Sequence, residues 1–308
     1  MANIKKLLVP VDLTETSELV LDQAAALAGK AQASIDVLYG FEVPDVVPVG
    51  LRTSETTFGA QSLTALVEKE AQRRLAEFVT RASERGVVIA HTFTEIGSPA
   101  RTILETARTG HHDLIVMGTH GRTGLSHMVL GSVAEKVVRQ AQCPVLTLRG
   151  TNPHVALPTS ILVPVDYSSS SAAALAYAVD LAALLGAKLD VVHVWDRPSF
   201  VSEQVQVHGP GDTRRTLGEL IREGAEREMR EFLSAGALER SATAVDLSSR
   251  LLSGDPASAL MAELALGHHD LVVTGTRGRT GLQHLLLGSV AEKLVRLSPV
   301  PVLTVPHR

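Results

Sequence analysis

The chain has 308 residues, too many for one ordinary hydrophobic core and enough for two domains of about 150 residues each. Its 29 Lys and Arg against 33 Asp and Glu give a net charge of −4, and it has only six Phe, three Tyr and one Trp, so nucleic acid is not expected as a main partner. A single cysteine, Cys143, cannot form a disulfide within the chain, which fits a reducing compartment.

The chain carries no sequence pattern for export or for membrane insertion. Lys5 and Lys6 are followed by an apolar run that is too short for the core of an export signal. The most apolar window, residues 172–187, is interrupted by Asp180 and is shorter than the roughly 20 residues that span a bilayer. We therefore expect a cytoplasmic protein with no membrane partner.

Strands and helices are expected to alternate along the first half of the chain. An apolar run at residues 6–11 predicts a strand, and a helical stretch follows at about 17–29. The next expected elements are a strand at 34–38, an irregular surface stretch at 42–62, a charged helix at about 63–85, strands at 87–94, 113–117 and 144–148, and helices at 103–107 and 132–141. Near-continuous Val, Ile and Leu in strands separated by helices predict a parallel sheet covered on both faces.

The second half of the chain repeats the first. The segment from Leu8 to Asp12 (LVPVD) recurs from Leu162 to Asp166, and residues 113–148 match 270–305 at about two thirds of their positions. The period is far longer than a solenoid repeat, so a whole domain has been duplicated. We expect domains at residues 1–149 and 159–308, with a Pro-containing linker between them and a second irregular stretch at 196–212.

Each copy carries a glycine signature after its fourth predicted strand. It consists of G-x-x-G, nine residues and then G-S. The signature residues are Gly118, Gly121, Gly131 and Ser132 in the first copy and Gly275, Gly278, Gly288 and Ser289 in the second. Glycines let the chain turn sharply and let backbone N–H groups approach a bound anion, so the signature predicts a phosphate site.

The last part of the signature stands at the start of a predicted helix. The positive end of a helix favours a phosphate, which fits Gly131 and Ser132. An alternative is that Ser132 and Glu135 form only a capping box, as Ser289 and Glu292 would in the second copy.

Asp12 and Asp166 follow the first strand of each copy. Ligands of open parallel sheets bind beyond the carboxyl ends of the strands, so these aspartates are expected to complete the two sites by accepting hydrogen bonds from an adenine or a ribose. The alternative is that each carboxylate serves only as the N-cap of the following helix.

On these residues the chain resembles the universal stress protein family in its tandem, two-domain form. Further points of resemblance are Pro10-Val11-Asp12, Pro164-Val165-Asp166 and the closing CPVL and VPVL segments. The resemblance implies an α/β fold of two Rossmann-like, adenine nucleotide alpha hydrolase-like domains, each with a five-stranded parallel sheet in the order 3-2-1-4-5. It also implies ATP with Mg²⁺ as ligand, a role in stress survival or metabolic regulation, pairing of the two domains through their last strands, and a possible homodimer.

The resemblance also implies which residues bind the nucleotide. In the first copy they are Pro10, Asp12, Met117, Gly118, Gly121, Arg122, Gly131, Ser132 and Val133. In the second copy they are Pro164, Asp166, Val194, Gly275, Gly278, Arg279, Gly288, Ser289 and Val290. Two departures stand out, because Gly40 replaces Val194 in the first copy and Thr274 replaces Met117 in the second. Each pocket therefore lacks one apolar wall, and we expect unequal affinities.

Other polar residues have two interpretations. The sequences His111-His112-Asp113 and His268-His269-Asp270 are expected to form polar turns, because adjacent residues do not converge on a metal and no third ligand is evident. The signature loops also contain His120, Arg122, Arg277 and Arg279. These cations either meet phosphate oxygens or are solvated.

Three functions fit this sequence. The first is an ATP-binding regulatory protein, favoured by two phosphate sites without a visible catalytic set. The second is a slow ATP hydrolase or another ATP-using enzyme, but the chain has neither a Walker lysine loop nor the HIGH or SGGxDS motifs of adenylating relatives. The third is a non-catalytic dimerisation scaffold.

Overall fold

The computed structural model describes residues 4–42, 60–119, 130–149, 156–195, 205–208, 214–234, 245–278 and 287–307. These residues form two compact units, one ending at Leu157 and the other beginning at Pro158. None of the described helices is both long and apolar enough to cross a membrane.

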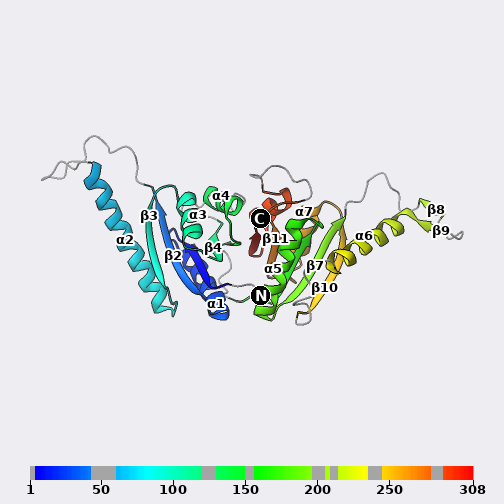
Figure 1. The fold of residues 1–308 in the computed structure, drawn as a ribbon, viewed down its shortest axis with the longest axis horizontal. Helices are drawn as coiled ribbons and strands as arrows, with labels where there is room; N and C mark the ends of the chain where they lie inside the picture. The colour runs from blue at the N-terminus through cyan, green and yellow to red at the C-terminus, as the bar shows by residue number, and fades with distance from the viewer. Residues whose placement is uncertain are drawn as a thin grey trace. The chain divides into compact units, whose positions relative to one another are not determined.

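The first domain is a parallel sheet with helices on both faces (Figure 1). Its elements are β1 (Lys6–Pro10), α1 (Glu15–Ala31), β2 (Ser34–Phe41), α2 (Ala60–Glu84), β3 (His91–Ile96), α3 (Pro99–Thr109), β4 (Leu114–Gly118), α4 (Ser132–Gln140) and β5 (Val145–Leu148). The strands lie in the order β3-β2-β1-β4-β5, and every neighbouring pair is parallel. This confirms the predicted sheet and its strand order.

The second domain has the same topology. Its elements are β6 (Ser160–Val165), α5 (Ser169–Leu185), β7 (Lys188–Trp195), α6 (Leu217–Ser234), β10 (Leu247–Ser253), α7 (Pro256–Ala265), β11 (Leu271–Gly275), α8 (Ser289–Leu297) and β12 (Val302–Val305). The strand order is β10-β7-β6-β11-β12, again with parallel neighbours. The duplicated sequence therefore folds twice into the same architecture.

Part of the stretch expected to be irregular forms a hairpin in the second domain. Strands β8 (Gln206–His208) and β9 (Arg214–Thr216) pair antiparallel directly before α6. The prediction of an irregular segment at 196–212 is therefore wrong at residues 206–208, because three-residue strands are too short to show an alternating pattern. In the first domain the irregular stretch expected at 42–62 is wrong at residues 60–62, because α2 begins at Ala60, and residues 43–59 lie outside the described residues.

The core lies along the central strands. Leu7, Leu8 and Val9 of β1 are fully buried although they alternate between the two faces of the sheet, and β4 is buried in the same way. Figure 1 shows the reason, since α2 and α3 lie on opposite sides of this sheet. Burying each such side chain contributes about 1.5–3 kcal/mol, so the central strands are firmly held. They give the turns and loops at the carboxyl end of the sheet a rigid support.

Candidate functional site

The turn after β1 is organised by Asp12. Its Oδ1 accepts hydrogen bonds from the Thr14 backbone N–H at 3.2 Å, the Thr14 hydroxyl at 2.5 Å and the Ser17 hydroxyl at 2.6 Å. The N-cap of α1 is Thr14. The interpretation of Asp12 as the N-cap is therefore wrong, and its carboxylate instead shapes the turn in front of the helix.

The second domain repeats this turn with different residues. Asp166 Oδ1 accepts from the Ser168 backbone N–H at 3.1 Å and the Ser168 hydroxyl at 2.5 Å, and Ser168 is the N-cap of α5. The residue after each aspartate, Leu13 or Tyr167, has a left-handed backbone with φ of 64°. This conformation costs a residue with a side chain about 1–3 kcal/mol. Both domains therefore keep the same strained turn beside the expected site.

The signature loop of the first domain is fixed at both ends. At its start the Thr119 N–H donates to Leu148 O at 2.9 Å, and at its end the Gly131 N–H donates to Thr119 O at 2.9 Å. Gly131 is the N-cap of α4, with φ of −61° and ψ of 137°, and Ser132 is the first helical residue. The capping-box prediction for Ser132 is therefore wrong, because the cap position belongs to a glycine.

The same geometry fixes the loop of the second domain. The Gly288 N–H donates to Thr276 O at 2.9 Å, and Gly288 is the N-cap of α8. The capping box expected for Ser289 and Glu292 is wrong for the same reason. A glycine cap has no side chain that could accept a hydrogen bond from the first N–H groups of the helix.

A cavity of about 450 Å³ in the first domain joins these elements. It is lined by Pro10, Val11, Asp12, Thr16, Ser17, Val20, Tyr39, Gly40, Phe41, Glu42, Pro99, Ile103, Met117, Gly118, Thr119, Gly131, Ser132, Val133 and Ala134. Seven of the nine residues expected in this copy are among them. The other two, Gly121 and Arg122, lie outside the described residues, as does His120. Pockets of about 300–1,000 Å³ are typical of small-molecule sites.

The cavity has a wall that sequence reasoning missed. Tyr39, Phe41 and Glu42 line it from the end of β2, and the rings of Tyr39 and Phe41 stack with their centroids 5.5 Å apart. Pro99 and Ile103 line it from α3. The sequence could have indicated these residues, because they lie on, or directly after, elements that flank the carboxyl end of the predicted sheet.

Gly40 is explained by its neighbour Thr102. A Cβ on Gly40 would lie 2.5 Å from Thr102 Oγ1, and this hydroxyl donates to Pro99 O at 3.0 Å. At the corresponding places the second domain has Val194 and Ala259. The departure at Gly40 is therefore compensated. The first domain has a smaller residue on the strand and a larger one, Thr102, on the helix that packs against it.

In the second domain the expected residues gather around Gly278. A Cβ on Gly278 would lie 3.1 Å from Asp166 Oδ2, and one on Gly288 would lie 3.5 Å from Gly278 N. A Cβ on Gly275 would lie 2.8 Å from the backbone oxygen of Ser170, so that position requires glycine. The strand end, the loop and the start of α8 therefore approach one another closely.

The remaining expected residues of the second domain lie at the ends of its elements. Pro164 is in β6 and Val194 is half-buried at the end of β7, beside Leu252 of β10. Ser289 and Val290 begin α8. Arg277 donates its backbone N–H to Ser170 Oγ at 3.3 Å, whereas Arg279 lies outside the described residues.

The histidine turns are not simply polar. His111 is exposed with a left-handed φ of 52°, but His112 is buried and its Nε2 lies 3.0 Å from Asp36 Oδ2. Asp36 also contacts His91 Nδ1 at 2.9 Å and Lys6 Nζ at 3.0 Å. Burial alone would raise the pKa of Asp36, but hydrogen bonds from His91, Lys6 and His112 outweigh it and lower that pKa below its usual value.

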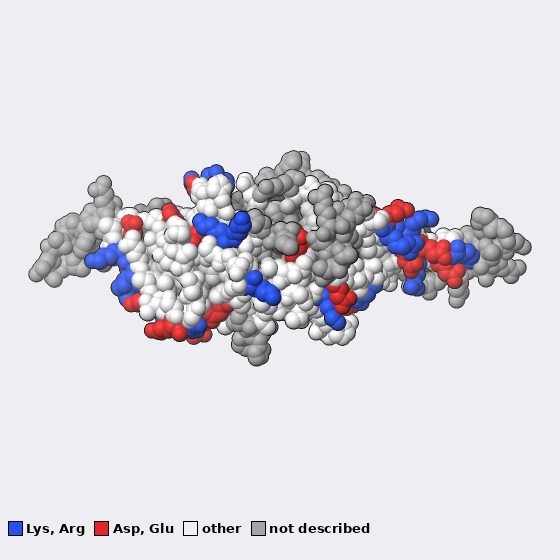
Figure 2. All heavy atoms as spheres, turned by 60° about the horizontal axis from the view of Figure 1, so that its bottom comes forward, with Lys and Arg blue, Asp and Glu red and all other residues white. Residues whose placement is uncertain are grey.

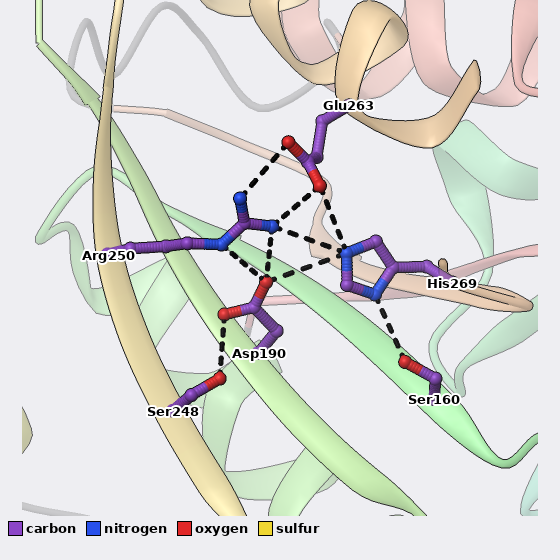
Figure 3. Close-up of polar contacts among 6 residues, drawn as sticks. All are labelled: Ser160, Asp190, Ser248, Arg250, Glu263 and His269. Carbon is purple, nitrogen blue, oxygen red and sulfur yellow. Dashed lines mark hydrogen bonds and ion pairs between the residues drawn. The ribbon is translucent and has the colours of Figure 1, made fainter. Parts of the chain in front are cut away.

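The second domain carries a different set of charges at the same place (Figure 3). Arg250 of β10 lies 2.6 Å from Asp190 Oδ2 of β7 and 2.7 Å from Glu263 Oε1 of α7. The Nε2 of His269 lies 3.5 Å from each of these carboxylates, and its Nδ1 lies 3.2 Å from Ser160 Oγ. The Arg250 hydrogen bond lowers the pKa of Glu263 despite burial.

Both charge clusters stand at the amino ends of the strands, away from the glycine loops. Asp113 and Asp270 stand beside them, and their carboxylates accept backbone N–H groups at the starts of β1 and β6. Within the described ranges, no group of three or more His, Cys, Asp or Glu is arranged to hold a metal ion. In the second domain the cluster joins β7 and β10 to α7 through Arg250.

Known proteins resemble the chain over both of its halves. The Universal stress protein family model matches residues 3–149 and again 159–306. A universal stress protein of Methanocaldococcus jannaschii is 38% identical over 146 residues, covering 47% of this chain and 82% of that protein. Another from Mycolicibacterium smegmatis is 26% identical over 311 residues, covering 98% of this chain and 97% of its own. The crystal structure of a universal stress protein from Archaeoglobus fulgidus has the same fold, with a TM-score of 0.69 at 22% identity and 98% coverage of both chains.

Proposed function

The chain belongs to the universal stress protein family, and from that premise we propose that it is a regulatory protein that binds ATP in the cavity of its first domain. One observation carries the proposal. A single cavity brings the end of β1, the end of β4 and the glycine-capped start of α4 together. The helix start favours phosphate, while the β1 and β2 ends offer room and polar groups for adenosine.

The residues have separate roles in this proposal. The backbone N–H groups of Ser132 and Val133 donate hydrogen bonds to phosphate oxygens, and Asp12 accepts a hydrogen bond from the adenosine part. Met117 and Pro10 form apolar walls for the base. Magnesium enters as the companion of ATP, held mainly by the phosphates.

In this proposal the cavity binds ATP without transferring its phosphoryl group, and Arg122, the cation expected beside the phosphates, lies outside the described residues. Among the described residues that line the cavity, Asp12 and Glu42 are the charged ones, and neither neutralises a developing phosphoryl charge. Transfer chemistry needs cationic groups that stabilise the transition state more than the ground state. Slow ATP hydrolysis is therefore the alternative outcome of the test below, and control through nucleotide occupancy is the proposed role.

The two sites are proposed to bind nucleotide unequally. The first domain has Gly40 and Met117 on its cavity. In the second domain Thr274 replaces the methionine and is buried, and Gly278 lies directly against Asp166. The cavity that opens beside Asp12 supports tighter binding in the first domain.

The family resemblance supports three further parts of the proposal. We expect the two domains to pair through their last strands, the whole chain to form a homodimer, and the protein to work in the cytoplasm. Light scattering of the purified full-length chain measures its oligomeric state. A strictly monomeric chain at micromolar concentration contradicts the homodimer.

A charge at the first position of α4 tests the binding site. Ser132→Asp suits a helix start, so the fold is retained, but its carboxylate repels phosphate. We expect at least about a tenfold loss of ATP affinity, measured by calorimetric titration. The matched control is Ser289→Asp at the start of α8, which leaves the tighter of the two binding constants unchanged.

Two outcomes contradict the proposal. The first is no ATP binding by the wild-type chain at millimolar concentration. The second is binding that Ser132→Asp leaves unchanged. Phosphate release above a matched blank, lost in Ser132→Asp, would instead favour the ATPase.

A further inference from the structure

A second cavity lies in the second domain, between α6 and the edge strand β10. It has a volume of about 630 Å³ and is lined by Trp195, Arg222, Glu226, Met229, Arg230, Ser249, Arg250, Leu251 and Ser253. We propose that this cavity binds a small aromatic anion, meaning a single ring that carries a carboxylate or phosphate. The inference is independent of nucleotide binding in the first domain.

The cavity exists because α6 packs loosely. Its first-domain counterpart, α2, buries Ala71, Leu75, Phe78 and Ala82. Within α6, all of which the structure describes, Met229 is the one buried residue. A helix with so small an apolar contact leaves space between itself and the sheet.

The strand beneath α6 is unusually polar on this face. Successive strand residues point to opposite faces, so Ser249, Leu251 and Ser253 face α6, while the side chain of Arg250 points to the other face and binds Asp190 and Glu263. Ser249 and Ser253 are exposed. Two hydroxyl groups under a helix give a ligand polar contacts that an ordinary core does not offer.

The aromatic part of the ligand is assigned to Trp195. This residue pairs in register with Ser253 and so shares the face that α6 covers. It is half-buried, lines the cavity and is the one tryptophan of the chain. With Met229 and Leu251 nearby, its indole provides a flat apolar surface for a ring to stack on.

The anionic part is assigned to Arg230 and Arg222. Arg230 is exposed and forms no ion pair with any residue in the described parts of the chain. Arg222 pairs with Glu226 at 3.0 Å, but this exposed pair one helical turn apart is weak, so an anion can compete for the guanidinium. Figure 2 shows basic and acidic side chains intermixed over the α6 part of the surface. The side chains that reach into the cavity carry a net positive charge.

Trp195 itself reports on binding. We expect phenyl phosphate and benzoate to change its fluorescence saturably in the full-length chain, with inorganic phosphate and benzyl alcohol each binding at least about tenfold more weakly. Arg230→Gln, alone or with Arg222→Gln, weakens phenyl phosphate binding at least about tenfold. The matched control is Arg227→Gln, an exposed arginine of the same helix outside the cavity lining.

A second comparison separates this cavity from the nucleotide site of the same domain. Ser289→Asp must leave the phenyl phosphate response unchanged. The proposal is overturned if phenyl phosphate produces no saturable response up to about 10 mM, a range of weak affinity for one ring. It is also overturned if Arg230→Gln and Arg227→Gln behave alike, or if Ser289→Asp abolishes the response.

Discussion

At the residue scale, Gly40 and Thr102 share one small volume beside the cavity of the first domain. The Thr102 hydroxyl stands where a β-carbon on residue 40 would otherwise lie, at 2.5 Å. In the second domain the larger residue, Val194, is on the strand and the smaller one, Ala259, is on the helix. Sequence alone made Gly40 look like a missing wall, because its compensating partner is on a helix 62 positions further along.

We predict that the two positions are energetically coupled. Gly40→Val alone forces the valine against Thr102 and lowers the free energy of unfolding by about 1–3 kcal/mol. Adding Thr102→Ala restores much of that loss, giving an interaction energy of about 0.5–3 kcal/mol in a double-mutant cycle measured by urea unfolding. Strictly additive effects would show that the two side chains do not compete for space.

Asp36 gives a prediction about pH at the same scale. Its folded pKa lies below the usual 3.8, so its pairing stabilises the protein above that value and is lost as pH falls through the folded pKa. Asp36→Asn should therefore lower stability at neutral pH, with the difference from wild type shrinking below pH 3.8. Urea unfolding across this range measures the effect. A difference that grows as pH falls would contradict the assignment.

At the element scale, α7 is attached to its sheet through Arg250. Asp190 and Glu263 are largely buried, and both depend on this guanidinium. Arg250→Ala leaves these two carboxylates with the His269 ring as their remaining shared partner. We predict a loss of about 2–4 kcal/mol, less than for a fully buried pair because the Arg250 side chain is 41% exposed.

The matched control is Arg222→Ala, which breaks an exposed pair within α6 and should cost no more than about 0.5 kcal/mol. Thermal and urea unfolding of both variants give the comparison. Similar losses for the two would mean that the charge cluster of Figure 3 does not hold α7 in place.

The helices and strands also show which features can be predicted from the sequence and which cannot. Val, Ile and Leu runs separated by amphipathic stretches were sufficient to predict the sheet and its covering helices. They were not sufficient for the caps, because Gly131 takes the cap position through its backbone conformation, which displaces Ser132 into the helix. His112 was expected in a polar turn. Its burial against Asp36 could not be predicted, because Asp36 is distant along the chain.

At the scale of the whole molecule, the two duplicated domains keep the same topology but differ in side-chain contacts. Both domains keep the strained turn after the first strand and the glycine-capped fourth helix. They differ in the charge clusters, in the packing of α2 and α6, and in the residues at positions 40 and 194. The repeat was readable from sequence, whereas these differences depend on contacts between distant residues. The result is two domains of the same topology with different residues at their expected ligand sites.

The nucleotide content of the purified full-length chain tests this account most directly. Mass spectrometry of small molecules released on denaturation, quantified per chain after loading with ATP and removal of the excess, should find an adenine nucleotide in wild type. The nucleotide should be retained in Ser289→Asp and lost in Ser132→Asp. Wild-type protein without nucleotide, or nucleotide retained by Ser132→Asp and lost from Ser289→Asp, would contradict the assignment of the principal site to the first domain.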